Sequence, residues 1–271
     1  MNWIHLDDIT LRYELAGQGR ETMVLLHELG GSLESFDSLT PLLGGSLDVL
    51  RYDLRGAGLS EKPRAAFAFD DHVDDLAGLL AALDINAPVH VAGVAAGAAL
   101  AVSFALRCPQ LVRSLALCAP ALNVDEERVR YLAQRSELVM RDGMRAVADD
   151  TLDRSYPPIV RRDAAAYLSY RGRFLGNDPV GYARNNLAFA QVHLLDRLKE
   201  LASPCLVLAG AHDLLRPPDK VGVIAQMIPR ADYAIADSGH LMPVQAPGEM
   251  ARHLLDFVAP VEGGVALSHA S

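Results

Sequence analysis

Cysteine is scarce in this sequence. Its 271 residues include three cysteines, Cys108, Cys118 and Cys205, and none of them stands in a C-x-x-C pair. This spacing argues against a disulfide framework or a cysteine zinc site and indicates reduced, buried thiols in a cytoplasmic protein. The nine histidines form no H-x-x-x-H or H-E-x-x-H pattern. We therefore expect neither a metal ion nor another cofactor.

Long apolar runs and an excess of basic residues are also lacking. No apolar run approaches the roughly 18–20 residues that a membrane span requires, and Met1–Thr10 lacks the profile of a signal peptide. The 25 Lys and Arg residues face 34 Asp and Glu residues, which gives a formal net charge of −9. Binding to nucleic acid needs a basic surface that neutralises phosphates. We expect a small-molecule substrate, and neither nucleic acid nor a membrane as a partner; a homodimer is compatible with the sequence.

Short apolar segments alternate with amphipathic ones along most of the chain. The expected strands are Met23–His27, Asp48–Asp53, Val89–Gly93, Ser114–Cys118, Cys205–Ala209 and Tyr233–Ala236, and the expected helices are Phe69–Leu83, Gly97–Arg107 and Gly248–Phe257. This alternation predicts an α/β fold in which helices cover both faces of a mostly parallel sheet. Ile9–Ala16, which precedes a Gly-Gln-Gly turn, is predicted to form an antiparallel edge hairpin.

The alternation stops in the middle of the chain, where helical periodicity continues through residues 124–195. That segment contains eleven arginines, ten acidic residues and no lysine. Its net charge is therefore near +1, while that of the rest of the chain is near −10. We predict a helical cap over residues 124–195. The core then consists of residues 1–123 and 196–260, and residues 261–271 form a flexible tail.

Five polar or glycine-rich pieces each follow a predicted strand. They are His27–Ser32, Asp53–Ser60, Gly93–Gly97, Gly210–Asp213 and Ser238–His240. The carboxyl ends of parallel strands meet at one edge of a sheet, where open α/β sheets bind their ligands. We therefore expect these distant pieces to converge on one pocket.

In this order the five pieces resemble those of enzymes with the α/β-hydrolase fold, above all the enol-lactonase and C–C-bond hydrolase branches. That family carries a nucleophile elbow, G-x-S-x-G, followed along the chain by an acid and a histidine. Asp213 in "GAHDLLRP" and His240 in "DSGHLMP" stand where the acid and the histidine belong. The resemblance implies an eight-stranded sheet with a helical cap, a cytoplasmic role in small-molecule catabolism, and an oxyanion hole formed by the N–H groups of Leu29 and Ala96.

The sequence departs from the family pattern at two positions. The elbow reads "GVAAG", so Ala95 occupies the nucleophile position and no acyl-enzyme can form there. Glu28 stands where the family usually has glycine. If Glu28 faces the pocket, it favours an amine-bearing substrate or transfers a second proton; otherwise it turns outward or caps a backbone group. Glu28 and His27 are the candidates for substrate binding, although in this family the histidine usually braces the oxyanion loop.

Three explanations of Ala95 remain open from the sequence. In the first, the alanine is natural, as in some family members that resemble this chain, including aminoacrylate hydrolases of pyrimidine breakdown. In the second, the alanine replaces a serine in an engineered, inactive variant. In the third, the protein has lost catalysis and has kept a binding pocket. With a natural alanine, His240 oriented by Asp213 would activate water for hydrolysis of an ester, lactone, amide, enamine or C–C bond.

A cofactor-free lyase or oxygenase would need the same base and the same oxyanion site. Relatives of the enol-lactonase type often act on small acids. An arginine of the cap would then pair with a substrate carboxylate. The candidates are Arg128, Arg135, Arg171, Arg173 and Arg184.

Overall fold

The apolar segments form one sheet in the computed structural model, which describes residues 2–19 and 21–262. Within that part of the chain, eight strands pair in the order β1-β2-β4-β3-β5-β6-β7-β8. They are β1 (Asn2–His5), β2 (Thr10–Ala16), β3 (Thr22–Leu26), β4 (Asp48–Tyr52), β5 (Val89–Val94), β6 (Val112–Cys118), β7 (Cys205–Gly210) and β8 (Ala231–Ala236).

Only β2 runs against the other strands of the sheet. β2 pairs antiparallel with both β1 and β4, whereas every pair from β4 to β8 is parallel. The predicted edge hairpin is thus β1 and β2. The predicted α/β architecture, a mostly parallel sheet of eight strands between helices, is confirmed.

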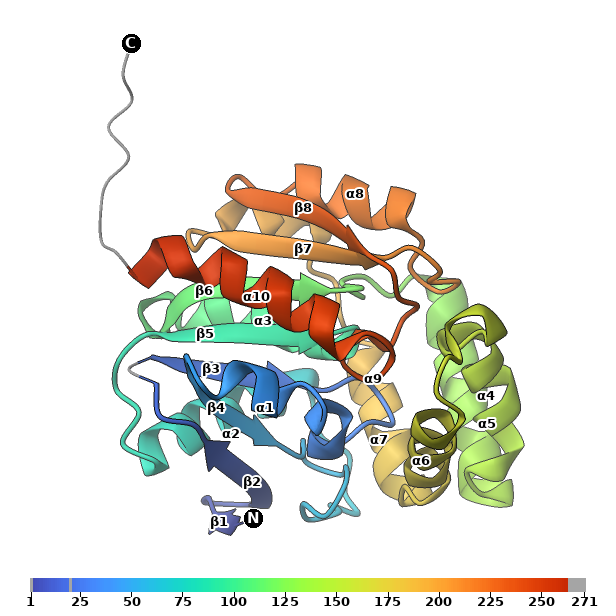
Figure 1. The fold of residues 1–271 in the computed structure, drawn as a ribbon. Coiled ribbons are helices and arrows are strands. Elements are labelled where there is room, and N and C mark those ends of the chain that lie inside the picture. The colour runs from blue at the N-terminus through green and yellow to red at the C-terminus, as the bar shows by residue number, and fades with distance from the viewer. Residues whose placement is uncertain (1, 20, 263–271) are drawn as a thin grey trace.

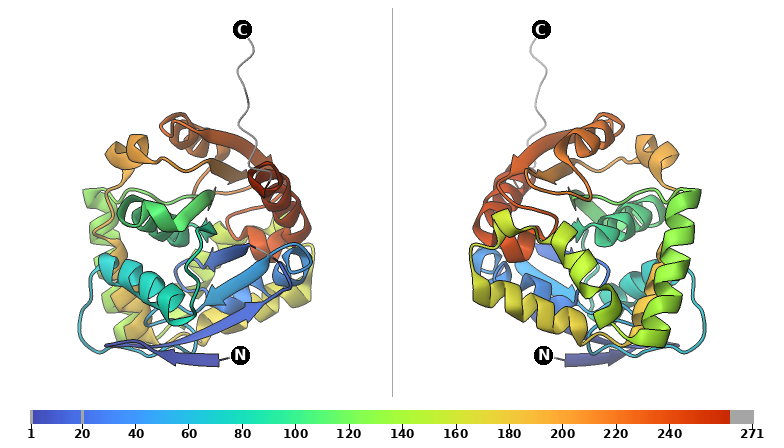
Figure 2. Two further views of the ribbon diagram at one scale, coloured as in Figure 1. Left: turned by 90° about the vertical axis from the view of Figure 1, so that its left-hand side faces the viewer. Right: turned by 90° about the vertical axis from the view of Figure 1, so that its right-hand side faces the viewer.

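Helices cover both faces of the sheet (Figures 1 and 2). The core elements are α1 (Thr40–Leu43), α2 (Phe69–Ala82), α3 (Ala96–Arg107), α8 (Pro218–Gln226), α9 (Met242–Gln245) and α10 (Pro247–Glu262), with the short 3-10 helices η1 (Leu33–Phe36), η2 (Pro109–Leu111) and η4 (Leu195–Glu200). Side chains of a strand point alternately to opposite faces. On β3, Val24 and Leu26 join the apolar cluster under α2 and α3, while Met23 and Leu25 join the cluster under α1 and α10.

The helices between β6 and β7 stand apart from this core, beside the carboxyl ends of the strands (Figure 1). They are α4 (Glu126–Asp142), α5 (Arg145–Ser155), the 3-10 helix η3 (Pro158–Val160), α6 (Ala164–Leu175) and α7 (Pro179–Phe189), and we call them the cap. The cap has its own apolar cluster, which includes Leu152 and Phe174. Its two ends meet where Asn123 and His193 form an isolated antiparallel bridge.

The chain ends after α10 as far as the structure describes it. Residues 261 and 262 of the predicted tail are the last two residues of α10, and residues 263–271 lie outside the described part of the chain. Among the described residues, no helix combines the length and the apolar character that crossing a bilayer would require.

Candidate active site

The turn between β5 and α3 places Ala95 at the carboxyl edge of the sheet. Ala95 has φ 52° and ψ −107°, a backbone conformation that residues other than glycine rarely adopt. Two glycines let the strand and the helix approach closely: a Cβ on Gly97 would lie 2.2 Å from the Leu26 carbonyl oxygen, and one on Gly93 would lie 2.2 Å from the Gly97 oxygen. Ala96 begins α3, so its N–H belongs to the donors that have no acceptor within the helix.

Asp213 and His240 meet beside this turn. Asp213 follows β7 and His240 follows β8, and the His240 Nδ1–H donates to Asp213 Oδ2 at 2.8 Å. Asp213 Oδ1 accepts the N–H groups of Leu215 and Arg216 at 2.8 and 2.9 Å. Burial alone would raise the pKa of Asp213, but the adjacent imidazole and these hydrogen bonds bring that pKa below its ordinary value. The ionised carboxylate holds the imidazole so that Nε2 is the nitrogen available to the cavity described below.

The loop after β3 carries His27, Glu28 and Leu29. The His27 Nε2 accepts the N–H of Leu54 at 3.1 Å, and its Nδ1–H donates to the Glu28 carbonyl oxygen at 2.8 Å. Both ring nitrogens are therefore engaged by backbone groups. These hydrogen bonds favour a role for His27 in stabilising the loop over a role in contacting a ligand.

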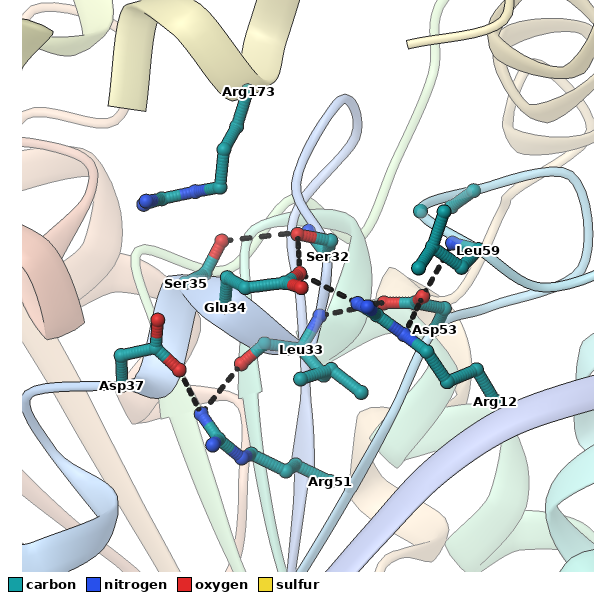
Figure 3. Close-up of polar contacts among 12 residues, drawn as sticks. Arg12, Ser32, Leu33, Glu34, Ser35, Asp37, Arg51, Asp53, Leu59 and Arg173 are labelled. Atoms are coloured by element: carbon teal, nitrogen blue, oxygen red, sulfur yellow. Dashed lines mark hydrogen bonds and ion pairs between the residues drawn. The ribbon is translucent and has the colours of Figure 1, made fainter. Parts of the chain in front are cut away.

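A buried ionic network fixes the same loop from below (Figure 3). The Asp53 carboxylate accepts the N–H groups of Leu33 at 2.8 Å and Leu59 at 2.6 Å, and it pairs with Arg12 at 2.6 Å. Arg12 also donates to Glu34 at 2.6 Å. Burial alone would raise the pKa of Glu34, but hydrogen bonds from Arg12 and Ser32 lower it to about 2. Glu34 is therefore ionised at neutral pH, and its ion pair with Arg12 helps to hold the segment that follows Leu29.

The Glu28 side chain points inward, between core and cap. Its side chain is 3% exposed, and Oε1 accepts hydrogen bonds from Ser35 Oγ at 2.9 Å and from the Tyr170 hydroxyl at 2.7 Å. A Cβ on Gly31 would lie 2.3 Å from that oxygen, so glycine makes room for the carboxylate. Glu28 thus neither turns to solvent nor caps a backbone group. Its hydrogen bond with Tyr170 connects the loop to α6.

These pieces surround a cavity of about 90 Å³. A single water needs roughly 10–15 Å³ of such space, so the cavity accommodates a small molecule. One side, which we call the core wall, is formed by Leu29, Ala95, Ala96 and His240. The opposite side, the cap wall, includes Arg128, Tyr131, Arg135 and Arg154 from α4 and α5. The structure therefore brings the predicted dyad, nucleophile position and oxyanion residues together at one cavity.

The arginines at the cavity differ in part from those expected. Arg128 and Arg135 line it, whereas Arg171 pairs with Asp149, Arg173 donates to Ser169, and Arg184 donates to the Arg64 carbonyl. Arg154 and Arg216 line the cavity as well, and sequence reasoning missed both.

Two signals in the sequence could have found part of this group. Arg128, Tyr131 and Arg135 are spaced by three and four residues, which places them on one face of a helix. Arg216 stands three residues after the predicted acid, Asp213, within the same loop.

No replacement nucleophile stands out among Cys118, Ser238 and Ser32, which lie near the carboxyl ends of the strands. Burial raises the pKa of the Cys118 thiol to about 12, so the reactive thiolate is not formed at neutral pH. Ser238 is fully buried and hydrogen-bonds Gly239 and Gln245, and Ser32 donates to Glu34. Within residues 2–19 and 21–262, no group of three or more His, Cys, Asp or Glu side chains is placed to hold a metal ion.

Comparison with known proteins gives consistent results. The model of a family described as "alpha/beta hydrolase fold" matches residues 21–247. A protein named "Putative carbamate hydrolase RutD" from Pantoea ananatis is 29% identical over 261 residues, which cover 91% of this chain and 92% of that protein. Two solved structures are also similar. The enol-lactonase from Burkholderia xenovorans LB400 has a TM-score of 0.88 and 27% sequence identity, and the match covers 95% of this chain and 99% of the enol-lactonase chain. The malate-bound esterase from Thermogutta terrifontis has a TM-score of 0.89 and 26% sequence identity, and the match covers 93% of this chain and 94% of the esterase chain.

Proposed function

This chain belongs to the α/β-hydrolase family and is a hydrolase, and from that premise we propose that it cleaves its substrate with an activated water in place of a covalent nucleophile. The bond is an ester, lactone, amide, enamine or C–C bond of a small molecule. One observation carries the proposal: the hydrogen bond between His240 and Asp213 is present, and His240 lines the same cavity as Ala95.

In the proposed step, His240 Nε2 takes a proton from a water molecule whose oxygen attacks the carbonyl or imine carbon of the substrate. The electron pair of the double bond moves to the substrate oxygen or nitrogen, which the N–H groups of Leu29 and Ala96 stabilise. Asp213 stabilises the imidazolium. A C=O bond then forms again as the bond to the leaving group breaks, and His240 gives its proton to that group. An ester, lactone, amide or C–C bond yields a carboxylic acid and an alcohol, amine or carbon leaving group, and an enamine in its imine form yields a carbonyl compound and an amine.

The loss of the serine leaves part of the catalytic apparatus in place. In serine hydrolases, substrate positioning and the oxyanion hole alone give a residual acceleration of about 10³–10⁴. Ala95 keeps the backbone conformation of the elbow, with φ 52°, and therefore keeps Ala96 at the start of α3. This apparatus suits a bond that is already labile in water.

We propose further that the substrate is a small acid. Four arginines line the cavity, and guanidinium groups pair well with carboxylates. The similar esterase from Thermogutta terrifontis was solved with malate, a dicarboxylate, bound. Glu28 is the substrate-binding candidate on the loop, because its Oε2 atom has no hydrogen-bond partner among the described residues and accepts a substrate N–H or O–H. In this proposal His27 contributes only by bracing that loop.

The variant His240→Ala tests the proposal. We expect it to lower kcat/KM by about 1,000-fold or more for any substrate that the wild type turns over, with an unchanged thermal unfolding midpoint. His253→Ala, on α10 and outside the cavity, is the matched control and should retain activity. Turnover that survives in His240→Ala would refute the role of the dyad.

A second variant separates water attack from an inactivated serine enzyme. Ala95→Ser restores the elbow "GVSAG", and p-nitrophenyl acetate reports an acyl-enzyme as a burst of nitrophenol. We expect the wild type to hydrolyse its own substrate without a burst. If only Ala95→Ser turns over any ester, lactone or amide tested, the wild type is an inactive serine hydrolase and the water mechanism is wrong.

A further inference from the structure

We infer that the cavity recognises a dianion, a substrate with two carboxylate groups, through an arginine cluster formed by Arg128, Arg135, Arg154 and Arg216. The inference deepens the proposed function by naming the substrate class. It does not depend on how the bond is cleaved, because it concerns the binding of the anion alone. The evidence is the packing of the guanidinium groups, their charge balance and their position in the lining of the cavity.

Tyr131 organises three of the four arginines. The Arg128 guanidinium lies 4.4 Å from the centre of the Tyr131 ring, and those of Arg135 and Arg154 each lie 5.9 Å from it. The Tyr131 hydroxyl accepts hydrogen bonds from Arg135 at 3.1 Å and from Arg154 at 2.9 Å. Arg135 also donates to the hydroxyls of Tyr182 and Thr151. The guanidinium groups of Arg128 and Arg135 thus contact neutral side chains, which do not compensate their charge.

The charge balance of the cavity calls for an anion. Arg154 pairs with Asp150 at 2.6 Å, but no ion pair of the described residues involves Arg128, Arg135 or Arg216. Glu28 is the only acidic residue among those that line the cavity in the described chain. Among the lining residues, three arginines without an ion-pair partner against one carboxylate leave an excess of two positive charges. Asp213 and Asp125, which are not among the lining residues, also attract Arg216 electrostatically. Two carboxylates of a ligand would balance the excess of the lining residues.

Like charges crowd at this site in a partly desolvated setting. Burial lowers the pKa of Arg128, and the nearby charges of Arg154 and Arg135 lower it further. Burial also lowers the pKa of Arg216, and the charge of Arg128 adds to that effect. The Arg128 Nε atom is buried and has no hydrogen-bond partner among the described residues. A bound carboxylate would relieve both the repulsion and the missing hydrogen bond.

Arg128 and Arg216 also line a second hollow next to the cavity. The other charged residues that line this hollow are Lys220 and Asp125, so three cations face one carboxylate there. The hollow thus attracts anions on a protein with a formal net charge of −9. Because Arg216 follows the Asp213 loop directly, an anion held there lies at the end of the cavity that carries the dyad. The second carboxylate then lies toward Tyr131 and the cap.

Binding of succinate by isothermal calorimetry at constant ionic strength tests this inference. We expect succinate to bind at least about tenfold more tightly than propionate, which has one carboxylate, and dimethyl succinate, which is neutral, to show no binding. Inorganic phosphate tests for a compact dianion and should bind more weakly than succinate. If propionate binds as tightly as succinate, or if phosphate binds more tightly, the dicarboxylate assignment is wrong.

Variants assign the binding to the cluster. Arg128→Ala and Arg216→Ala should each weaken succinate binding about tenfold or more, because each removes a charge-assisted hydrogen-bond donor. Arg171→Ala removes a cap arginine outside the cavity and should leave the affinity unchanged. If Arg128→Ala fails to fold, Arg128→Lys, which keeps the charge and loses the planar fork, should bind succinate with intermediate affinity. Unchanged affinity in the Arg128 and Arg216 variants would overturn the inference.

The two proposals can fail separately. His240→Ala should bind succinate like the wild type, because the imidazole is not part of the arginine cluster. Loss of turnover in His240→Ala together with no succinate binding in the wild type would leave the hydrolase mechanism standing and refute the dianion site. Succinate binding that depends on Arg128 in a protein without turnover would give the opposite result.

Discussion

The two walls of the cavity are held in place by different means. Behind the core wall, charged groups are buried and paired: Arg12 with Asp53, and Arg55 with Asp75, each at 2.6 Å. Breaking such a buried pair costs about 3–5 kcal/mol.

The ion pairs of the cap lie at its surface instead. They include Arg141–Asp142, Arg161–Asp153 and Arg171–Asp149, in which each acidic partner is substantially exposed. Exposed pairs contribute about 0–1 kcal/mol each.

This difference indicates a division of labour. In the proposed mechanism the core wall supplies two backbone N–H groups and an oriented imidazole, which must be positioned to within a fraction of an ångström. The cap wall presents guanidinium groups, which act on an anion over a longer range and tolerate small displacements. Rigid support is therefore found where the proposed chemistry takes place, and looser support is found where charge is recognised.

The largest effect is expected from adding one methyl group behind the core wall. In Gly97→Ala the new Cβ would lie 2.2 Å from the Leu26 carbonyl oxygen, which is backbone and cannot yield easily. We expect the free energy of unfolding to fall by about 3 kcal/mol or more in urea denaturation, with loss of activity. Gly172→Ala on α6 of the cap is the matched control. Nothing lies within 4 Å of its new Cβ, so the higher helix propensity of alanine should stabilise the protein by about 0.5–1 kcal/mol. Similar losses in both variants would contradict the comparison.

A smaller effect is expected from Glu34→Gln, which weakens the ionic network of Arg12, Glu34 and Asp53 next to the loop that carries Leu29. The pKa of Glu34 is lowered from 4.5 to about 2, which corresponds to roughly 2 kcal/mol after allowance for its partial exposure. Because the folded-state pKa lies below the ordinary value, this stabilisation is complete above pH 4.5 and is lost as the pH falls towards 2.

Denaturation curves at several pH values check this expectation. The difference between Glu34→Gln and the wild type should be largest at neutral pH and should shrink in acid. Asp149→Asn, which breaks the exposed pair with Arg171, is the control from the cap and should change stability by less than about 0.5 kcal/mol. A difference for Glu34→Gln that does not vary with pH would show that the carboxylate charge is not the cause.

The smallest effect concerns the elbow itself. Ala95 has a positive φ of 52°, a strain that costs about 1–3 kcal/mol in a residue with a Cβ. Ala95→Gly removes the strain and raises the backbone entropy of the unfolded chain, so the net stabilisation should be about 1 kcal/mol by urea denaturation. Ala99→Gly, in the regular part of α3, should be destabilising. Destabilisation by Ala95→Gly would mean that the elbow is not strained.

Much of the core could be predicted because its signals are local. The buried strands are short apolar runs, and a piece that follows such a strand must lie at the carboxyl edge of the sheet. For this reason the pieces that carry Asp213 and His240, 27 residues apart, could be expected to lie at one edge of the sheet, and the resemblance to the α/β-hydrolase family implied that these two residues pair. β8 was harder to delimit. It begins at Ala231, two residues before the predicted start, because it is an edge strand whose side chains are only partly buried.

The cap wall could not be assigned in the same way. Arg154 reaches the cavity only because α5 packs against α4, and Arg171 misses it because α6 turns that side chain towards Asp149. Glu28 faces inward because Gly31 leaves space for its carboxylate and Tyr170, 142 residues further along the chain, donates a hydrogen bond to it. Contacts between distant segments leave no periodic trace in the sequence.

The order of apolar segments and polar turns by itself predicted a mostly parallel sheet with polar turns at one edge, because these follow from hydrophobic periodicity and from the geometry of parallel strands. The elbow with alanine at its centre and the pairing of an acid with a histidine were implied by the resemblance of the sequence to the α/β-hydrolase family. The choice of arginines at the cavity and the direction of Glu28 were decided only by the tertiary structure. The physical reason is that the position of a charged side chain depends on which neighbours fill the space around it, and the packing of the cap on the core determines those neighbours.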